Sequence, residues 1–111
     1  MSSDELLRLR GEVAAAIAVL DADLLALFEA ARSSNADDEH DPEGTTIAFE
    51  RAQLTAVRDA GRRRLADLDD ALRRQADGTY GVCERCDRPI PADRLAARPA
   101  SRTCVPCASA R

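Results

Sequence analysis

The N-terminal part of the chain carries apolar residues at a regular spacing. Leu6 lies seven residues before Val13, and the next positions are separated by 4, 3, 4 and 3 residues: Val13, Ile17, Leu20, Leu24 and Leu27. This spacing places the side chains along one stripe of an α-helix and is typical of a coiled-coil seam. Ser2, with Glu5 three residues later, predicts a helix start. We therefore expect a helix over about residues 3–32.

A second stripe predicts a second long helix. Its members are Ile47, Leu54, Val57, Leu65, Leu68 and Leu72. Asp41 and Pro42 are residue types favoured at the N-cap and the first helical position, and Gly78 favours a stop, so we expect a helix over about residues 42–77. Gly61 occupies a position of the stripe, where it weakens the helix by roughly 1 kcal/mol relative to Ala. A glycine there also lets a partner backbone approach closely.

Two such stripes, joined by a short polar segment, favour an antiparallel hairpin within one chain. Each helix then buries its apolar stripe against the nearest complementary one. The fold class that we expect is all-α: an antiparallel two-helix coiled-coil hairpin followed by a small C4 zinc finger. Ordinary bundle packing and a homodimeric coiled coil are the alternatives. An intramolecular hairpin corresponds to a monomer.

The composition supports slender helices, because the 111 residues include two Phe, one Tyr and no Trp. A chain this short buries a modest core. The net charge of −4 is unevenly distributed. The predicted tip loop, residues 33–41, and the start of the second helix contain acidic residues and no Lys or Arg: Asp37, Asp38, Glu39, Asp41 and Glu43. We expect His40, in the same loop, to be exposed.

Two charge clusters lie on the predicted second helix. Residues 62–64 are three arginines, and Asp67, Asp69 and Asp70 follow them. We expect both clusters to be solvated outer faces of the helix, with ion pairs between residues four apart.

Neither end of the sequence predicts export or membrane insertion. The N-terminal residues MSSDELLRLR are acidic and polar, and the longest apolar run, residues 14–20, is far shorter than a bilayer span requires. We therefore expect a cytoplasmic protein that does not enter a membrane. In that compartment, paired cysteines hold metal more often than they form disulfides.

The four cysteines form two pairs with the spacing C-x2-C-x17-C-x2-C: Cys83 with Cys86, and Cys104 with Cys107. A two-residue gap lets a tight turn aim both sulfurs at one point, and two such turns supply the tetrahedron that Zn²⁺ accepts. Four thiolates leave no open coordination position, so the prediction is one structural zinc ion. A redox pair and two disulfides are the alternatives, although no βαβ pattern surrounds the motif.

Residues 79–111 form the predicted zinc-finger module, and residues 1–78 form the predicted helical hairpin. A module of this size with almost no aromatic residues cannot bury enough surface to stay folded alone, whereas metal binding supplies on the order of 10 kcal/mol. The expected apolar packing consists of Val82, Ile90, Leu95 and Val105, with Tyr80 at the junction to the helix. His40 lies far along the chain and is not expected to bind the metal.

The residues around the cysteines follow a longer pattern. Tyr80 and Gly81 precede the first pair, and Ile90, Arg94, Leu95, Ala97 and Pro99 lie between the pairs. This arrangement, without a gap over 28 residues, resembles the zinc finger of the DksA/TraR proteins, which bind bacterial RNA polymerase. Asp87 stands where that family usually has Gly. Asp tolerates the left-handed backbone that such turns need.

The resemblance also implies a function for the acidic loop. In the larger family members, an antiparallel coiled coil enters the secondary channel of the polymerase and brings two tip aspartates, in the pattern D-x-x-D-x-A, near the catalytic centre. Asp38 and Asp41 have this spacing, while Glu43 stands at the alanine position. Asp37, Glu39 and Glu43 are further acidic candidates for the tip effector. Alternatively, Asp41 caps the second helix, and Asp37 and Asp38 keep the loop soluble.

Some family members act together with the alarmone ppGpp. The resemblance places one basic residue used there at Arg98, but two lysine positions hold Asp67 and Ala108, which argues against alarmone dependence. Arg94 and Arg98 are the candidates for docking or for an alarmone contact.

We therefore expect a non-enzymatic transcription regulator that binds RNA polymerase directly and alters the stability of promoter open complexes. The alternative is a zinc module that binds DNA or another protein through Arg85, Arg88, Arg94, Arg98 and Arg102. Nearby acidic residues and a negatively charged tetrathiolate centre offset much of that charge, and no recognition helix follows, so we do not expect sequence-specific DNA binding. We find no nucleophile with an attendant base and no phosphate-binding glycine loop.

Overall fold

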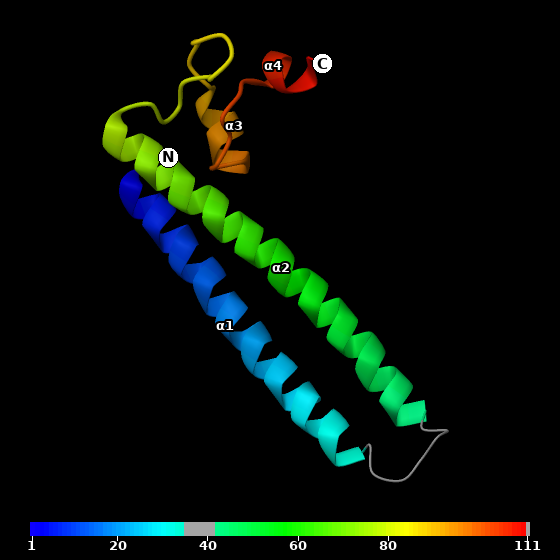
Figure 1. Ribbon diagram of the computed structural model, residues 1–111. Coiled ribbons are helices and arrows are strands. Elements are labelled where there is room, and N and C mark those ends of the chain that lie inside the picture. Colours follow the sequence, from blue (N-terminus) through cyan, green and yellow to red (C-terminus); the bar gives the residue numbers. More distant parts are fainter. Residues whose placement is uncertain (35–41, 111) are drawn as a thin grey trace. The chain divides into compact units, whose positions relative to one another are not determined.

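The computed structural model of the protein describes residues 1–34 and 42–110. Within these residues the regular elements are α1 (Ser3–Ser34), α2 (Pro42–Asp77), α3 (Ala92–Ala97) and α4 (Val105–Ser109) (Figure 1). An isolated antiparallel bridge joins Val82 and Pro89. The predicted all-α fold, with two long helices followed by a small cysteine module, is confirmed.

The chain forms two compact units, and each contains part of α1 and part of α2. The helical unit comprises residues 13–63, and the cysteine unit comprises residues 1–12 together with 64–110. In both units the two long helices run in opposite directions (Figure 1). The domain division predicted at residue 78 stays a prediction.

Ser2 caps the first turn of α1, as the sequence predicts. Its hydroxyl oxygen accepts a hydrogen bond from the backbone N–H of Glu5 at 3.2 Å, and the hydroxyl donates to the Glu5 carboxylate at 3.1 Å. The Ser2 carbonyl accepts a bond from the N–H of Leu6 at 3.0 Å. A helix start leaves backbone donors without intrahelical partners, and the Ser2 side chain satisfies one of them.

The C-terminal end of α2 is a Schellman motif centred on Gly78, the residue that the sequence predicts as the stop. Gly78 has a φ of +82°, a left-handed conformation that glycine adopts without steric cost. The N–H groups of Gly78 and Thr79 donate to the carbonyls of Gln75 and Arg74 at 3.3 and 2.8 Å. These bonds satisfy carbonyls of the last helical turn and let the chain leave the helix axis.

The seam of the helical unit follows the predicted stripes. Ile17 and Leu24 are buried. Other predicted members are half-buried: Val13, Leu20, Leu27, Ile47 and Leu54. A Cβ atom at Gly61 would lie 3.1 Å from Cγ1 of Ile17. The close approach expected at Gly61 is therefore present, and the group that fills the space is the Ile17 side chain instead of a backbone.

One predicted member of the stripes, Val57, lies outside the seam and is 56% exposed. Arg58 takes the seam position, since Leu54, Arg58 and Gly61 keep the spacing of four and three residues. The Arg58 guanidinium lies 3.4 Å from the carboxylate of Asp21 on α1. The prediction for Val57 is wrong because an ion pair, which hydrophobicity does not reveal, occupies this position.

In the cysteine unit, the first turns of α1 pack against the last turns of α2. Leu6, Leu68 and Ala71 are buried in this contact, and Leu65 and Leu72 are half-buried. The four predicted leucines therefore lie in the seam. Ala71 was not among the predicted positions, because alanine carries little weight in a hydrophobic pattern.

Polar pairs also join the two helices of the cysteine unit. Arg10 forms an ion pair with Asp69. The Ser3 hydroxyl donates to the Gln75 side chain at 2.6 Å, and the Gln75 amide donates to the carbonyl of Met1 at 2.7 Å. Asp69 therefore contributes to the contact between the helices, which corrects the expectation of a solvated outer face.

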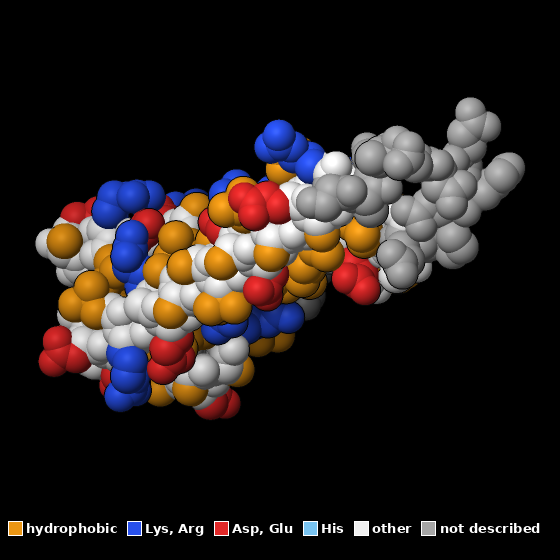
Figure 2. All heavy atoms as spheres, turned by 90° about the horizontal axis from the view of Figure 1, so that it is seen from below, with side chains coloured by type: hydrophobic (Ala, Val, Ile, Leu, Met, Phe, Trp, Pro, Cys, Tyr) orange, Lys and Arg blue, Asp and Glu red, His pale blue; other side chains and the backbone are white. Residues whose placement is uncertain are grey.

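Exposed apolar side chains are distributed along both long helices: Leu7, Val19, Leu25, Phe28, Phe49 and Val57. On the face seen in Figure 2, apolar side chains are interspersed with acidic and basic ones. Among the described residues, no helix has both the length and the apolar character that crossing a membrane demands.

Candidate metal centre

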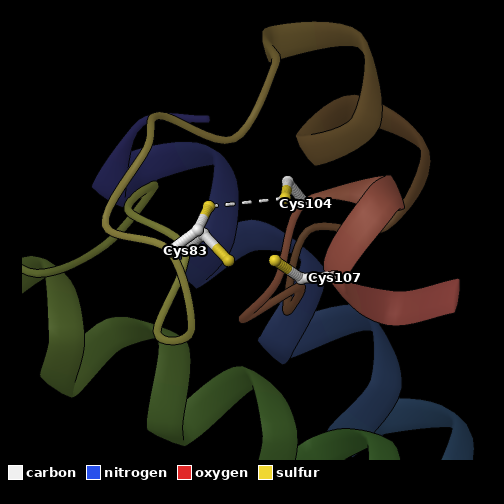
Figure 3. A group of neighbouring side chains, drawn as sticks. Cys83, Cys104 and Cys107 are labelled. Carbon is white, nitrogen blue, oxygen red and sulfur yellow. Dashed lines mark hydrogen bonds between the residues drawn. The ribbon is translucent and has the colours of Figure 1, made fainter. Parts of the chain in front are cut away.

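The sulfur atoms of the four cysteines converge in the cysteine unit. They all lie within 4.8 Å of one another. Figure 3 shows the side chains of Cys83, Cys104 and Cys107 pointing toward a common point. The cysteines are free thiols, and the Cys86 and Cys104 sulfurs are 3.7 Å apart, well beyond the roughly 2 Å of a disulfide bond. The predicted spatial cluster is present, and it is not disulfide-bonded.

The first cysteine pair lies in a tight turn, the first knuckle (residues 83–86). The N–H of Cys83 donates to the carbonyl of Arg88 at 2.8 Å, and the N–H of Asp87 donates to the carbonyl of Cys83 at 2.9 Å. Asp87 has a φ of +62°, as expected for a residue that replaces glycine in a left-handed position. The N–H of Ile90 then donates to the carbonyl of Gly81 at 2.7 Å, which closes the turn.

The second pair begins α4 and forms the second knuckle (residues 104–107). Cys104 is the N-cap of α4 and has an extended conformation, and Pro106 lies in the first turn, where a missing N–H has no cost. The N–H of Ala108 donates to the carbonyl of Cys104 at 2.9 Å. Cys104 and Cys107 are one helical turn apart, so both sulfurs can face the same side.

A small apolar core surrounds two of the sulfurs. Cys83, Ile90, Leu95 and Cys104 are buried together, and Tyr80 packs against them. The packing roles expected for Ile90, Leu95 and Tyr80 are therefore correct.

Two other residues expected in this core lie outside it. Val82 and Val105 are 41% and 53% exposed. Each directly precedes or follows a buried cysteine, Cys83 or Cys104. Val82 lies in an extended segment, where neighbouring side chains point to opposite sides, so the inward Cys83 directs it outward. Val105 begins α4, none of whose residues is buried. The cysteines themselves fill the positions that the valines were expected to occupy.

The electrostatics of the cluster favour a bound cation. Burial opposes ionisation of Cys83, but hydrogen bonds from the backbone N–H groups of Cys104, Arg85 and Cys86 outweigh it and lower its pKa to about 6. The neighbouring Cys104 side chain is the largest influence on Cys107 and raises its pKa to about 12. One thiolate therefore forms readily, and further ionisation is resisted by the neighbours. A divalent cation among the sulfurs would remove that resistance.

The donor set fits zinc. Four thiolates in closed tetrahedral geometry are a common structural zinc site, and soft sulfur ligands disfavour Mg²⁺ and Ca²⁺. The local hydrogen bonds that shape both knuckles come from the backbone, so the sulfurs stay available to the metal.

Arg74, on the last turn of α2, attaches the cysteine module to that helix. Its guanidinium donates to the carboxylate of Asp70 at 2.9 Å and to the carbonyls of Ala100 and Ser101 at 3.2 and 3.3 Å. It also lies 5.8 Å from the centre of the Tyr80 ring. With 13% of its side chain exposed, Arg74 is mostly shielded from water. Its hydrogen bonds to the carbonyls of Ala100 and Ser101, in the segment after α3, were not predicted from the sequence. The spacing of apolar residues gives no information about such contacts.

Asp70 is the carboxylate at the centre of this attachment. Arg102 contacts it at 2.9 Å and also approaches Glu84 of the first knuckle at 3.8 Å. Partial desolvation opposes the charge of Asp70, but the hydrogen bond from Arg74 and the nearby arginines lower its pKa. The prediction of an ion pair four residues apart is correct for Asp70 and Arg74. The prediction of a solvated outer face is wrong, because the module packs there.

The arginines predicted for docking line a hollow of about 420 Å³ in the cysteine unit. Arg94 is partly buried and donates from Nε to the carbonyl of Thr103 at 2.9 Å. Arg98 is exposed at the end of α3, and Arg64 and Asp67 of α2 line the same hollow. The hollow therefore combines basic groups with one carboxylate.

The predicted tip effector lies outside the described residues. This holds for Asp37, Asp38, Glu39 and Asp41, and for the nearby His40. Glu43 belongs to α2, but its side chain is also outside the description. The functional assignment of these carboxylates stays a prediction.

Comparison with known proteins gives matches to the cysteine module and to the fold. Residues 78–111 match the family model of the prokaryotic dksA/traR C4-type zinc finger. General stress protein 16O of Bacillus subtilis is 36% identical over 77 residues, which is 69% of this chain and 47% of that protein. The RNA polymerase-binding transcription factor DksA of Caulobacter vibrioides is 43% identical over 56 residues, 50% of this chain and 39% of that protein.

A solved structure is similar over nearly the whole chain. The transcription factor DksA2 from Pseudomonas aeruginosa superimposes with a TM-score of 0.81 and 26% sequence identity, covering 96% of this chain and 76% of that one. The alignments to the two curated relatives span less than half of those proteins' own lengths.

Proposed function

Because the chain is a DksA-like protein with a dksA/traR C4-type zinc finger, we propose that it binds RNA polymerase directly and regulates transcription without catalysing a reaction. The observation that supports this most is the combination of the finger match at residues 78–111 with a DksA2-like fold over almost the whole chain. The finger alone is compatible with many partners. The long paired helices in front of it are what a channel-binding regulator requires.

The finger holds one structural zinc ion in this proposal, with Cys83, Cys86, Cys104 and Cys107 as the ligands. Their sulfurs lie within 4.8 Å of one another, and the set of four thiolates is saturated. A saturated site has no position for a substrate or a reactive water, so the metal stabilises the fold. The protein carries out this role in the cytoplasm as a monomer, with α1 and α2 paired within one chain.

The proposed effector is the acidic loop between α1 and α2, with Asp38 and Asp41 as the principal carboxylates. Negative charge delivered into a basic, Mg²⁺-bearing channel changes the local potential strongly, because low-dielectric walls focus the field. Such a change can alter the stability of the promoter open complex without contact to promoter bases. Asp37 and Glu39 add charge to the same segment, and Glu43 adds charge at the start of α2.

The test compares two doubly substituted proteins with the wild type. Asp38→Asn with Asp41→Asn removes two charges from the loop, and Glu12→Gln with Asp23→Asn removes two from exposed positions of α1. We expect all three proteins to bind bacterial RNA polymerase holoenzyme in a fluorescence anisotropy titration, and only the loop variant to lose its effect on promoter open-complex lifetime. Absence of binding by the wild type would refute the proposed partner. Equal lifetimes for the loop variant and the wild type would refute the proposed effector.

Direct DNA recognition has less support from the contacts of the finger. Of the five arginines considered for DNA contact, Arg85, Arg94 and Arg102 already bind carbonyls or carboxylates of the protein itself. Arg88 and Arg98 are too few for a phosphate-binding surface of ordinary strength. We therefore propose that the finger does not read DNA sequence.

Alarmone dependence is also absent from the proposal. Arg98 lines the hollow near α3, but Asp67 lines it too. A carboxylate beside a polyphosphate costs binding free energy, since like charges at short range repel. The Nε–H of Arg94 already donates to the carbonyl of Thr103. We propose Arg94 and Arg98 as contributors to polymerase docking.

A further inference from the structure

Each knuckle has one cysteine that is buried in the core and one that is less buried. Cys83 and Cys104 are buried with Ile90 and Leu95, so the core fixes these two sulfurs. Cys86 is exposed, and Cys107 is half-buried at the edge of the core. The sulfurs of Cys86 and Cys107 therefore need another constraint if all four sulfurs are to stay within ligand distance of one metal ion.

Arg85 spans the exposed side of the cluster. It lies between the two cysteines of the first knuckle, and its Nη1 atom donates to the carbonyl of Cys107 at 3.0 Å and to the carbonyl of Ala110 at 3.3 Å. One side chain thereby connects the first knuckle to the backbone of a cysteine in the second. The same contact reaches Ala110, the C-cap residue of α4.

The position of these carbonyls makes a guanidinium an effective partner. α4 has five residues, and its last carbonyls lie at a helix C-terminus, where the aligned peptide dipoles favour positive charge. The N–H of Ala110 donates to the carbonyls of Cys107 and Pro106 at 3.3 and 3.1 Å. Arg85 adds a charged donor to the same Cys107 carbonyl. Hydrogen bonds with a charged donor are stronger than neutral ones.

We propose that Arg85 is a positioning residue for the metal, which holds the second knuckle against the first at the exposed edge of the core. The proposal rests on the assignment of zinc to the four cysteines. Departure of a metal from a closed site begins when one ligand moves away and water enters. By restraining the backbone of Cys107, Arg85 opposes that first movement and slows zinc loss.

Arg88 provides a matched control in the same turn. Its backbone carbonyl accepts the bond from Cys83, which a substitution preserves, and its exposed side chain makes no hydrogen bond or ion pair with the described residues. Arg85→Gln and Arg88→Gln each remove one positive charge next to the tetrathiolate centre. A difference between them therefore reports the contact to Cys107 and Ala110 instead of the net charge.

The experiment measures zinc release from the full-length, zinc-loaded protein into the chromogenic chelator 4-(2-pyridylazo)resorcinol. We expect Arg85→Gln to release zinc roughly tenfold faster than the wild type, the scale typical for residues that orient metal ligands, and Arg88→Gln to remain within about twofold. Arg85→Lys keeps the charge but loses the planar, forked donor, so its zinc release rate should lie between those of Arg85→Gln and Arg88→Gln. Visible spectra of the cobalt-substituted proteins check that each variant still forms a tetrahedral thiolate site.

Equal release rates for Arg85→Gln and Arg88→Gln would overturn the proposal, and so would a wild-type rate for Arg85→Gln with an unchanged cobalt spectrum. A wild-type protein that takes up neither zinc nor cobalt would instead refute the metal assignment itself. If Arg85→Gln fails to form the tetrahedral cobalt site while Arg88→Gln forms it, the positioning role is supported in its strongest form.

Discussion

The helical unit and the cysteine unit place their stabilising contacts differently. In the helical unit, α1 and α2 contact each other along a seam in which Ile17 and Leu24 are buried and Arg58 forms an ion pair with Asp21. In the cysteine unit, the module after α2 depends on a small core around two cysteines and on charged hydrogen bonds at Arg74.

The difference concerns how the free energy of folding is distributed. A seam spreads it over many similar contacts, so one substitution removes a small share. A module with four buried residues in its core cannot do this, so we expect its stability to be concentrated at the proposed zinc site and at a few polar anchors. Changes at single points should therefore affect the cysteine unit more than the helical unit.

Removal of the metal should have the largest effect, and it should separate the two units. Because metal binding contributes on the order of 10 kcal/mol to such sites, we expect a chelator to unfold residues 79–110 and to leave residues 13–63 helical. Amide signals in a ¹H–¹⁵N NMR spectrum would follow both regions at once, with added zinc as the reversal control. Loss of signals from both regions, or from neither, would contradict the proposed division of stability.

Substitution of Arg74 should have the second largest effect. Arg74→Met keeps an apolar stem but leaves the carbonyls of Ala100 and Ser101 and the carboxylate of Asp70 without this donor, so we expect a loss of about 2–3 kcal/mol in the free energy of unfolding. Guanidinium chloride titration of the zinc-loaded protein measures it. Arg73→Met is the control, because Arg73 is 72% exposed and its ion pair to Asp70 is 3.6 Å long. Equal losses for both variants would show that Arg74 is not an anchor.

A substitution in the seam should cost less and should affect the other unit. Gly61→Val places a Cβ 3.1 Å from Ile17 Cγ1 and adds two methyl groups, so we expect a loss of about 1–2 kcal/mol from overpacking. Gly11→Ala is the matched control on α1, because a Cβ at Gly11 meets no atom within 4 Å and should stabilise the helix by about 0.5–1 kcal/mol. Hydrogen exchange should place the loss within residues 13–63. A stabilising Gly61→Val would mean that the seam has spare room at this point.

Much of this fold follows from the order of residues along the chain. Apart from Val57, the apolar positions that heptad spacing identified are buried or half-buried in both units, because apolar burial is the main constraint on paired helices. The cysteine spacing identified the cluster, since two short turns leave few other geometries. Asp87 was understood for the same local reason: its backbone conformation is set within one turn.

The contacts that sequence reasoning missed connect residues that are far apart in sequence or replace an apolar residue by a charged pair. Arg58 occupies the seam because Asp21 lies opposite on another helix. Arg74 reaches Ala100, and Arg85 reaches Cys107, across 26 and 22 residues. The spacing of apolar residues cannot predict such pairs. They become visible only when the backbone places both partners.

Arg74 holds the cysteine module at two points of its chain. Its carbonyl accepts bonds from Thr79 and Tyr80, where the chain leaves α2, and its guanidinium holds Ala100 and Ser101, where the chain returns. These contacts come from one turn of α2, and residues 1–12, which include the start of α1, complete the same compact unit. For protein engineering, a graft of this module onto another helix would therefore have to carry Asp70 and Arg74 with it.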